Sequence, residues 1–255
     1  MSQFDLGGKV AVITGASRGI GAAIARAYVE AGARVVITGR RPESIEAAAA
    51  ELNARRPDHA LGLAAHAGDY ERTQEVVTAA VERFGRLDIV VANAGTNPHF
   101  GPILTSETSH WDKIMEVNVK GYFWLCQAAA RQMVAQGEGG KIVTVASITG
   151  LKPGAMMGVY SVSKAAVIMM TRVLAVELGA DNIQANCIAP GFVKTKFSRA
   201  LWDNPMLHKE LVGRTPAGRM ADPEELTGIA LYLASPASDF TTGEVFVVDG
   251  GYTLT

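Results

Sequence analysis

The sequence predicts an α/β fold in which about seven parallel strands form one doubly wound sheet with helices on both faces. Short apolar runs alternate with longer stretches of helical period along the whole chain. The apolar runs carry hydrophobic residues at consecutive positions, which is typical of strands that are buried on both faces. Hydrophobic residues make up 48% of the 255 positions and charged residues 19%, so the chain can bury a sizeable core as one domain.

The predicted strands are short and end near glycine, proline or polar residues. They cover residues 9–14, 34–38, 60–66, 88–92, 141–146, 183–189 and 244–248. The intervening stretches show helical period and stop signals such as Gly137. They predict helices from the first glycine turn to residue 31, over 43–55, up to residue 84, over 111–136 and over 160–179. Residues 191–221 hold several prolines and aromatics, and we interpret them as a substrate-covering lobe of the same domain.

A glycine-rich turn follows the first strand and opens the first helix. Its glycines are spaced G-x-x-x-G-x-G over 15–21, which differs from the G-x-G-x-x-G fingerprint of many dinucleotide-binding folds. Glycines let the backbone approach a ligand, and a helix N-terminus offers free N–H groups and positive potential to a pyrophosphate. Although such a turn can be merely tight, its place after the first strand of a doubly wound sheet favours a dinucleotide site.

The end of the second strand bears on the choice of cofactor. NAD sites place an acid there to bind the ribose 2′-hydroxyl, whereas NADP sites use arginine nearby. Here Arg40 and Arg41 follow the strand and Arg18 lies inside the glycine turn, with no acid at the tip. Surface arginines are common, but a guanidinium can grip a 2′-phosphate that a carboxylate would repel. We therefore expect NADP(H) rather than NAD(H).

The overall charge and composition argue against several other classes. Lys and Arg total 24 against 25 Asp and Glu, so no positive field favours nucleic acid or an anionic membrane. The N-terminus lacks signal-peptide features, and no apolar run approaches the length of a membrane span. We therefore expect the protein to be located in the cytoplasm. The histidines lack metal-ligand spacing. Cys126 and Cys187 lie in apolar runs and are interpreted as buried thiols.

Several motifs then occur in a fixed order along the chain. They are Thr14–Gly21, Asn93-Ala94-Gly95, Asn118, Ser147, Tyr160-Ser161-Val162-Ser163-Lys164 and Pro190-Gly191. Each alone is common, but together they resemble the short-chain dehydrogenase/reductase family over essentially the whole chain. The resemblance implies a Rossmann-type single domain, a nicotinamide cofactor and usually a homotetramer.

The resemblance also assigns roles to individual residues. It implies a catalytic set of Asn118, Ser147, Tyr160 and Lys164. It implies cofactor-binding residues Gly15, Ser17, Arg18, Gly19, Ile20, Gly21, Ala67, Asn93, Ala94, Gly95, Tyr160, Lys164, Pro190, Gly191, Val193 and Thr195, to which the end of the second strand adds Arg40. Two positions depart from the family pattern: Ala92 stands where a first asparagine is usual, and His66-Ala67 replaces the Asp-Val that contacts adenine.

The catalytic set suits proton transfer to a carbonyl oxygen. A free tyrosine with a pKa of ~10 is a poor acid near neutrality. Lys164 lies four residues after Tyr160, so on a helix both face the same side, and its charge is expected to lower the tyrosine pKa. Ser147 can donate to the substrate oxygen, and Asn118 can bend its helix and hold a water that resupplies the proton. Without these partners, Tyr160 would be interpreted as a half-buried aromatic.

The substrate is less strongly specified. Candidate substrate contacts are Ser147, Ile148, Met156, Met157, Phe192 and Trp202, with His99 and Phe100 nearby. They are largely apolar, and stretches 182–191 and 196–202 are similar to NADP-dependent carbonyl reductases of the peroxisomal retinal-reductase type. This favours a hydrophobic ketone or aldehyde. A 3-oxoacyl thioester is the alternative substrate, and a non-catalytic NADP(H)-binding scaffold or sensor is the alternative of another class.

The two long predicted helices bear on assembly. They carry Phe123, Trp124, Leu125, Met169, Met170 and Leu174. This is more apolar surface than one sheet face readily covers, so we expect a homo-oligomer, and the resemblance makes it a homotetramer.

Overall fold

A computed structural model describes residues 3–255, and in that range it contains one sheet of seven parallel strands in the order β3-β2-β1-β4-β5-β6-β7. This confirms the predicted doubly wound sheet, although strand ends shift by up to two residues. The strands are β1 (Val10–Ile13), β2 (Arg34–Gly39), β3 (Ala60–Ala64), β4 (Ile89–Ala92), β5 (Gly140–Val145), β6 (Ile183–Pro190) and β7 (Val245–Val248).

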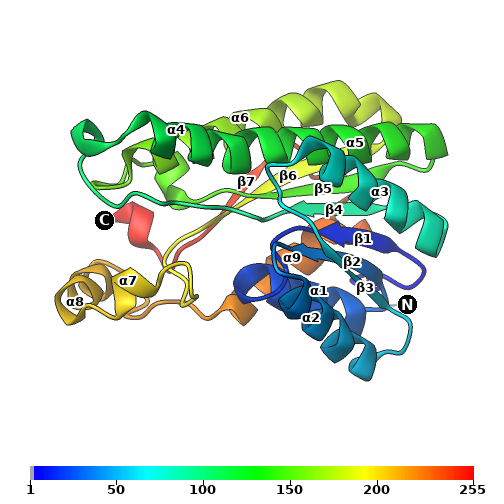
Figure 1. Cartoon of the computed structure of the whole chain (residues 1–255), viewed down its shortest axis with the longest axis horizontal. Coiled ribbons are helices and arrows are strands. Elements are labelled where there is room, and N and C mark those ends of the chain that lie inside the picture. The colour runs from blue at the N-terminus through cyan, green and yellow to red at the C-terminus, as the bar shows by residue number, and fades with distance from the viewer. Residues whose placement is uncertain (1–2) are drawn as a thin grey trace.

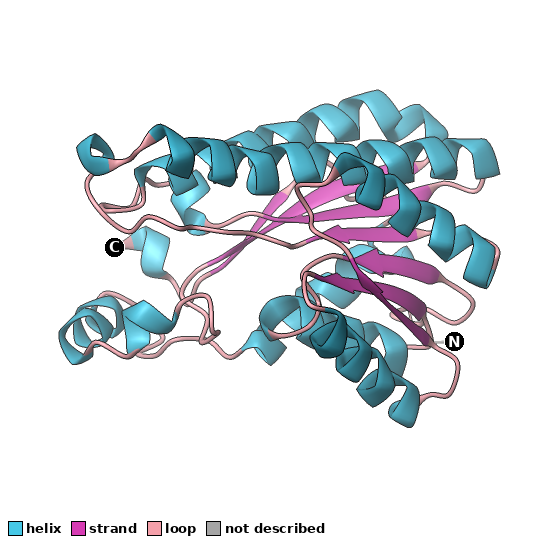
Figure 2. Ribbon diagram, in the orientation of Figure 1, coloured by secondary structure: helices cyan, strands magenta, loops and turns pink. Residues whose placement is uncertain are grey.

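Helices cover both faces of the sheet, as Figures 1 and 2 show. One face carries α1 (Gly19–Glu30), α2 (Pro42–Arg55) and α9 (Thr227–Ala234), and the other carries α3 (Tyr70–Phe84), α5 (Gly121–Gln136) and α6 (Gly158–Leu178). Each buried strand serves both faces. In β1, Ala11 and Ile13 pack with one hydrophobic cluster while Val10 and Val12 pack with the other. The unbroken apolar runs in the sequence reflect this burial on both sides.

Local sequence signals set where α3 begins and where α3 and α5 end. The Asp69 side chain accepts a hydrogen bond from Arg72 N (3.0 Å) and caps the start of α3, and Gly85 ends that helix with a positive φ of 85°. Gly137, with φ 71°, ends α5 at the predicted stop.

The helix predicted over 111–136 is wrong as one continuous element. The chain forms α4 (Thr108–Met115), a π-helical segment η2 (Glu116–Lys120) and α5. The wider turn accommodates Asn118, which is fully buried and hydrogen-bonded to the backbone of Thr96. The apolar period of the sequence does not register this insertion, because the polar residue points inward.

One helix is longer and more apolar than the sequence analysis expected, so the prediction that no apolar run approaches the length of a membrane span is wrong. The helical stretch Gly158–Asp181 has a mean hydropathy of 1.5 and is long and apolar enough to cross a membrane by length and composition alone. Half of its most apolar window is buried inside the protein. Its interior side carries Val167 and Ile168 against the sheet, as expected for a core helix.

The strand order reverses beside β1, because the chain runs outward to β2 and β3 and then returns to β4 on the other side. A crevice opens at such a switch point, beyond the carboxyl ends of the strands. Residues 191–221 lie at that end and include α7 (Arg199–Trp202) and α8 (Pro205–Gly213), which lie below α4 at the left of Figure 1.

Asp88, directly before β4, joins three parts of the fold. Its carboxylate accepts hydrogen bonds from Val10 N (2.9 Å) and from Arg86 Nε (2.8 Å), and only 5% of the residue is exposed. We predict that Asp88→Ala lowers the free energy of unfolding by about 2–4 kcal/mol, because it leaves a backbone donor and a guanidinium without their buried acceptor. Urea denaturation measures this effect.

Glu75→Ala is the matched control. It removes a carboxylate from the exposed pair that Glu75 forms with Arg72 (2.6 Å). An exposed pair contributes about 0–1 kcal/mol, so this change should be small. Equal losses in both variants would contradict the role given to Asp88.

Candidate active site

One pocket joins the glycine turn, the tip of β2 and the loops that follow β4, β5 and β6. The lining includes the predicted catalytic residues Ser147, Tyr160 and Lys164, and most of the predicted cofactor residues. The latter are Gly15, Ser17, Arg18, Gly19, Ile20, Arg40, Ala67, Asn93, Ala94, Gly95, Pro190, Gly191, Val193 and Thr195. Gly21 and Asn118 lie outside the lining.

The glycine turn is held against the loop after β4. Gly15 has a φ of 65°, and a Cβ added to it would lie 2.9 Å from Cα of Ala94. The amide of Asn93 donates to the carbonyl oxygens of Thr14 (2.9 Å) and Gly15 (3.2 Å). A Cβ on Gly21 would lie 2.5 Å from the same amide, so a glycine is needed there for this close packing.

The turn leaves a helix N-terminus facing the pocket. Arg18 occupies the N-cap position of α1 and makes no side-chain capping bond. A Cβ on Gly19, at φ 59°, would lie 3.3 Å from Cγ2 of Thr195, so the cradle is closed on its other side by the loop after β6. Free N–H groups in such a cradle fit a diphosphate.

The charge of the lining points the same way. No aspartate or glutamate lines the described pocket, whereas five cationic side chains do: Arg18, Arg40, Lys113, Lys164 and Lys196. Arg40 lies at the tip of β2 where the sequence predicted it, while Arg41 falls outside the lining. The residues therefore fit a polyanionic dinucleotide.

The end of the pocket beyond β3 contains His66, which the sequence analysis placed at the adenine-contacting position, and two residues that it missed, Lys113 and Val117. His66 lines it, with Nδ1 3.0 Å from Gly68 N and Nε2 3.3 Å from Lys113 Nζ. Burial, followed by Lys113, lowers the pKa of His66, so its ring is neutral at neutral pH. Lys113 and Val117 come from the α4–η2 stretch, where no local motif marks them.

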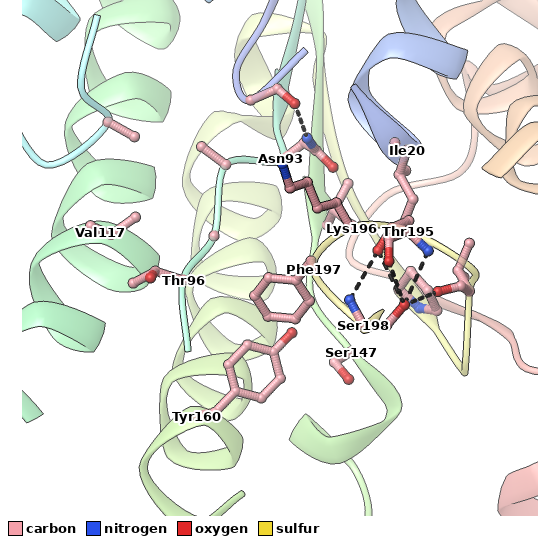
Figure 3. Close-up of a pocket in the computed structure, with 18 of the residues that line it drawn as sticks. Ile20, Asn93, Thr96, Val117, Ser147, Tyr160, Thr195, Lys196, Phe197 and Ser198 are labelled. Carbon is pink, nitrogen blue, oxygen red and sulfur yellow. Dashed lines mark hydrogen bonds between the residues drawn. The ribbon is translucent and has the colours of Figure 1, made fainter. Parts of the chain in front are cut away.

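The loop after β6 is braced internally. Ser198 Oγ donates to Val193 O (2.5 Å) and accepts from Thr195 N (3.1 Å), as the dashed lines of Figure 3 show. This network fixes the predicted cofactor contacts Val193 and Thr195. Lys196 and Phe197 extend from it into the pocket (Figure 3).

Ser147 follows β5 and faces the pocket near Tyr160 (Figure 3). Its Oγ accepts hydrogen bonds from Thr149 N (3.2 Å) and Thr149 Oγ1 (3.1 Å). A hydroxyl has two acceptor lone pairs and one donor hydrogen. Because Thr149 uses the acceptor capacity, the Ser147 hydrogen is left to donate to an oxygen in the pocket.

Tyr160 and Lys164 lie one turn apart on α6. The Lys164 ammonium donates to Val145 O (2.8 Å) and to Tyr122 Oη (3.2 Å), and lies 5.7 Å from the centre of the Tyr160 ring. Burial lowers the pKa of Lys164 to about 8. Burial also raises the pKa of Tyr160, and a hydrogen bond with Ser147 acts in the opposite direction.

The sequence predicted a lowered pKa for Tyr160, but in the protein without a bound cofactor the pKa of Tyr160 is raised. Burial disfavours the phenolate more than the hydrogen bond with Ser147 favours it, and Lys164 makes its hydrogen bonds elsewhere. Positive charge near the ring has to increase before Tyr160 can titrate near neutrality.

Asn118 is hydrogen-bonded to the loop after β4 and to α6. Its Nδ2 donates to Thr96 O (3.0 Å) and to Ser163 Oγ (3.1 Å), while Oδ1 accepts from Thr96 N (2.8 Å). These bonds fix the segment next to Gly95. Both amide hydrogens of the side chain are thus used within the protein, while Oδ1 keeps one lone pair that can accept from a water.

The predicted substrate contacts divide into two groups. Ser147, Ile148, Met157 and Phe192 line the pocket, whereas Met156 and Trp202 do not. Met156 is 42% exposed, and the indole of Trp202 donates to Thr195 O (3.1 Å). His99 and Phe100 also lie outside the lining.

Phe197 lines the pocket beside Tyr160, and the sequence analysis did not predict it. Its ring centre lies 5.9 Å from that of Tyr160, and its side chain is labelled beside that ring in Figure 3. The register of an irregular loop carries no signal that could have separated Phe197 from its neighbours.

The buried ammonium of Lys164 should make the stability of the fold depend on pH. The folded pKa of Lys164 is about 8 against an ordinary value of 10.5, so between these values the unfolded chain binds more protons. Lys164 should therefore make stability rise with pH from about 8 toward 10. The buried thiols Cys126 and Cys187 act against this rise above about pH 9, and buried tyrosines such as Tyr28 do so above about pH 10, because burial raises the pKa of each of these groups. We predict that Lys164→Met removes this rise. Urea denaturation across the range measures it, and an unchanged slope would contradict the burial of the charge.

Known proteins resemble this chain over nearly its full length. A protein-family model described as enoyl-(acyl carrier protein) reductase matches residues 15–253. The chain is 39% identical to dehydrogenase/reductase SDR family member 4 of Oryctolagus cuniculus, with 96% of this chain and 94% of the relative covered. It is also 39% identical to 2-dehydro-3-deoxy-D-gluconate 5-dehydrogenase of Dickeya dadantii, with 99% and 98% covered.

The fold has near neighbours among solved structures. A gluconate 5-dehydrogenase from Burkholderia cenocepacia, in complex with NADP and tartrate, has a TM-score of 0.94 and 36% sequence identity, with 99% of this chain and 98% of that chain covered.

Proposed function

Because this chain belongs to the short-chain dehydrogenase/reductase family, we propose that it is an NADP(H)-dependent oxidoreductase that reduces a hydrophobic ketone or aldehyde, with Tyr160 as the proton donor. Membership implies oxidoreduction between an alcohol and a carbonyl with a nicotinamide cofactor. The observation that supports the proposal most is the joining of Ser147, Tyr160 and Lys164 to the glycine turn in one pocket.

The chain supplies the proton and the charge stabilisation for the reaction. A bound nicotinamide supplies the hydride that reduces the carbonyl carbon. Tyr160 gives its phenolic proton to the carbonyl oxygen, and Ser147 donates a hydrogen bond to that oxygen as negative charge develops. The Lys164 ammonium favours the resulting tyrosinate. Asn118 keeps the loop beside Lys164 in place.

Two observations support NADP(H) over NAD(H). The tip of β2 offers Arg40 and no carboxylate, and the lining contains only cationic charged side chains. A solved relative also carries NADP. In this proposal Arg40 binds the 2′-phosphate, and Arg18, which lines the same pocket, adds positive charge.

The walls near Tyr160 support a hydrophobic substrate. Ile148, Met157, Phe192, Phe197 and Leu201 line the same pocket as Tyr160, and the Phe197 ring lies 5.9 Å from that of Tyr160. We propose that residues 191–221, which contribute three of these side chains, act as a substrate-covering lobe. A 3-oxoacyl thioester remains the alternative, and a sugar acid is a further one, favoured by Lys196 in the lining and by the gluconate-type relatives.

We also propose a homotetramer. The outer faces of α5 and α6 expose Phe123, Val134, Val162, Met169, Val173 and Val176. A second copy packed on these helices would remove that apolar surface from water. Sedimentation at the mass of a tetramer would support this, and sedimentation at the mass of a monomer or a dimer would contradict it.

A substrate panel followed by NADPH absorbance tests the proposed activity. The panel contains aromatic ketones, retinal, an acetoacetyl thioester and a keto-gluconate. We expect the fastest turnover with the apolar carbonyls. Preference for the thioester or the keto-acid would replace the substrate class, and NADPH binding without consumption would favour a non-catalytic sensor.

Tyr160→Phe removes the proton donor with little change in shape. We predict that kcat falls about a hundred- to ten-thousandfold, the range of general-acid contributions. The dissociation constant of NADPH, measured by fluorescence, should stay within a few-fold of the wild type. Retention of turnover would contradict the role of Tyr160.

Arg40→Ala removes the guanidinium at the tip of β2. A charge-assisted hydrogen bond contributes about 1.5–3 kcal/mol, so the KM for NADPH should rise about ten- to hundredfold. The KM for NADH should change little. Arg41→Ala is the matched control, since Arg41 lies next in sequence but outside the lining. Equal effects of Arg40→Ala on both cofactors would overturn the assignment.

A further inference from the structure

Tyr122 is a buried tyrosine of α5 that lies directly beneath the catalytic residues. Only 1% of the residue is exposed. Its hydroxyl donates to Val145 O (2.9 Å) and accepts from Lys164 Nζ (3.2 Å), while Lys164 also donates to the same carbonyl (2.8 Å). Lys164 Nζ lies 4.9 Å from the centre of the Tyr122 ring. The three polar groups thus form a closed triangle inside the core.

A buried ammonium needs such partners because burial costs it its hydration. The titratable groups that face Lys164 are Tyr160 on its own helix, Tyr122 from α5 and Cys187 from β6. All three are neutral at neutral pH, since burial raises the pKa of each. No carboxylate among the described residues pairs with Lys164. Its charge therefore depends on the dipoles of Val145 O and the Tyr122 hydroxyl.

We propose that Tyr122 is a positioning residue for Lys164, whose hydroxyl holds the lysine ammonium in its charged form on the pocket side of β5. The inference rests on the proposed function, because Lys164 acts there on Tyr160 and toward the cofactor. Tyr122 itself lies outside the lining of the pocket and touches the reaction only through Lys164.

The hydrogen-bond directions support this role. The phenolic hydrogen of Tyr122 is committed to Val145 O, so its oxygen lone pairs are free to accept from Lys164. If Tyr122 only filled the core, a phenylalanine would serve as well. The hydroxyl adds an acceptor that favours the ammonium over the neutral amine.

Tyr122→Phe tests the inference, because it deletes the hydroxyl and keeps the ring. The pKa of Lys164 is measured in the cofactor-free protein by NMR of lysine labelled at the ε-carbon. We expect it to fall from about 8 by about one unit, a tenfold change in the dissociation constant. NADPH affinity, followed by fluorescence, should then decline at a lower pH than in the wild type.

Tyr28→Phe is the matched control. Tyr28 is also fully buried and donates to a backbone carbonyl, Ala230 O (2.8 Å), but it lies on α1 and no cation of residues 3–255 is recorded against it. Both variants should lose similar stability, while only Tyr122→Phe moves the Lys164 pKa. A Lys164 pKa that is unchanged in Tyr122→Phe, or moved equally by both variants, would overturn the inference.

A second substitution covers the case in which Tyr122→Phe does not fold. Incorporation of 3-fluorotyrosine at position 122 keeps the hydroxyl but weakens it as an acceptor, so the pKa of Lys164 should fall by a smaller amount. An unchanged value would again overturn the inference. The NMR readout needs no turnover, so failure of the proposed function, seen as full activity in Tyr160→Phe, is distinguished from failure of this inference.

Discussion

The site depends on a positive charge that is held inside the hydrophobic core. Lys164 is 2% exposed, yet its ammonium lies between two helices and the end of β5. Such a charge is tolerated only where dipoles replace its lost hydration. Val145 O and the Tyr122 hydroxyl provide them, and the lowered pKa of Lys164 shows that the compensation is partial. Burial of the ammonium therefore lowers the free energy of unfolding, but it keeps a positive charge close to Tyr160.

The surrounding architecture keeps that charge at the pocket. The strand order reverses beside β1, which opens the crevice into which both the glycine turn and the loop after β4 project. Asn93 ties the turn to that loop, and Asn118 ties the next residues of the loop to the π-helical segment. Neither asparagine needs to touch a substrate. They hold the backbone so that a polyanionic ligand and Tyr160 lie at one site.

Much of this arrangement could be predicted from the sequence, because the predictive signals were local. Unbroken apolar runs predicted the strands, and Arg40 was identified by its place after one of them. The catalytic residues followed from a resemblance across the whole chain. The misses have another origin. Tyr122 and Lys113 reach the site through packing between distant elements, and the π-helical segment arises from tertiary contacts of one buried asparagine. Met156 and Trp202 lie outside the pocket lining, which the sequence did not indicate because an irregular loop has no period that fixes where a side chain points.

The central claim is that this pocket transfers hydride to a carbonyl carbon. The most direct measurement uses NADPH in which both hydrogens on the hydride-donating carbon of the nicotinamide are deuterium, with the best ketone of the panel, and analyses the alcohol by mass spectrometry. The account predicts one deuterium on the carbinol carbon of every product molecule. Alcohol formed without the label, or NADPH bound and never consumed, would contradict it.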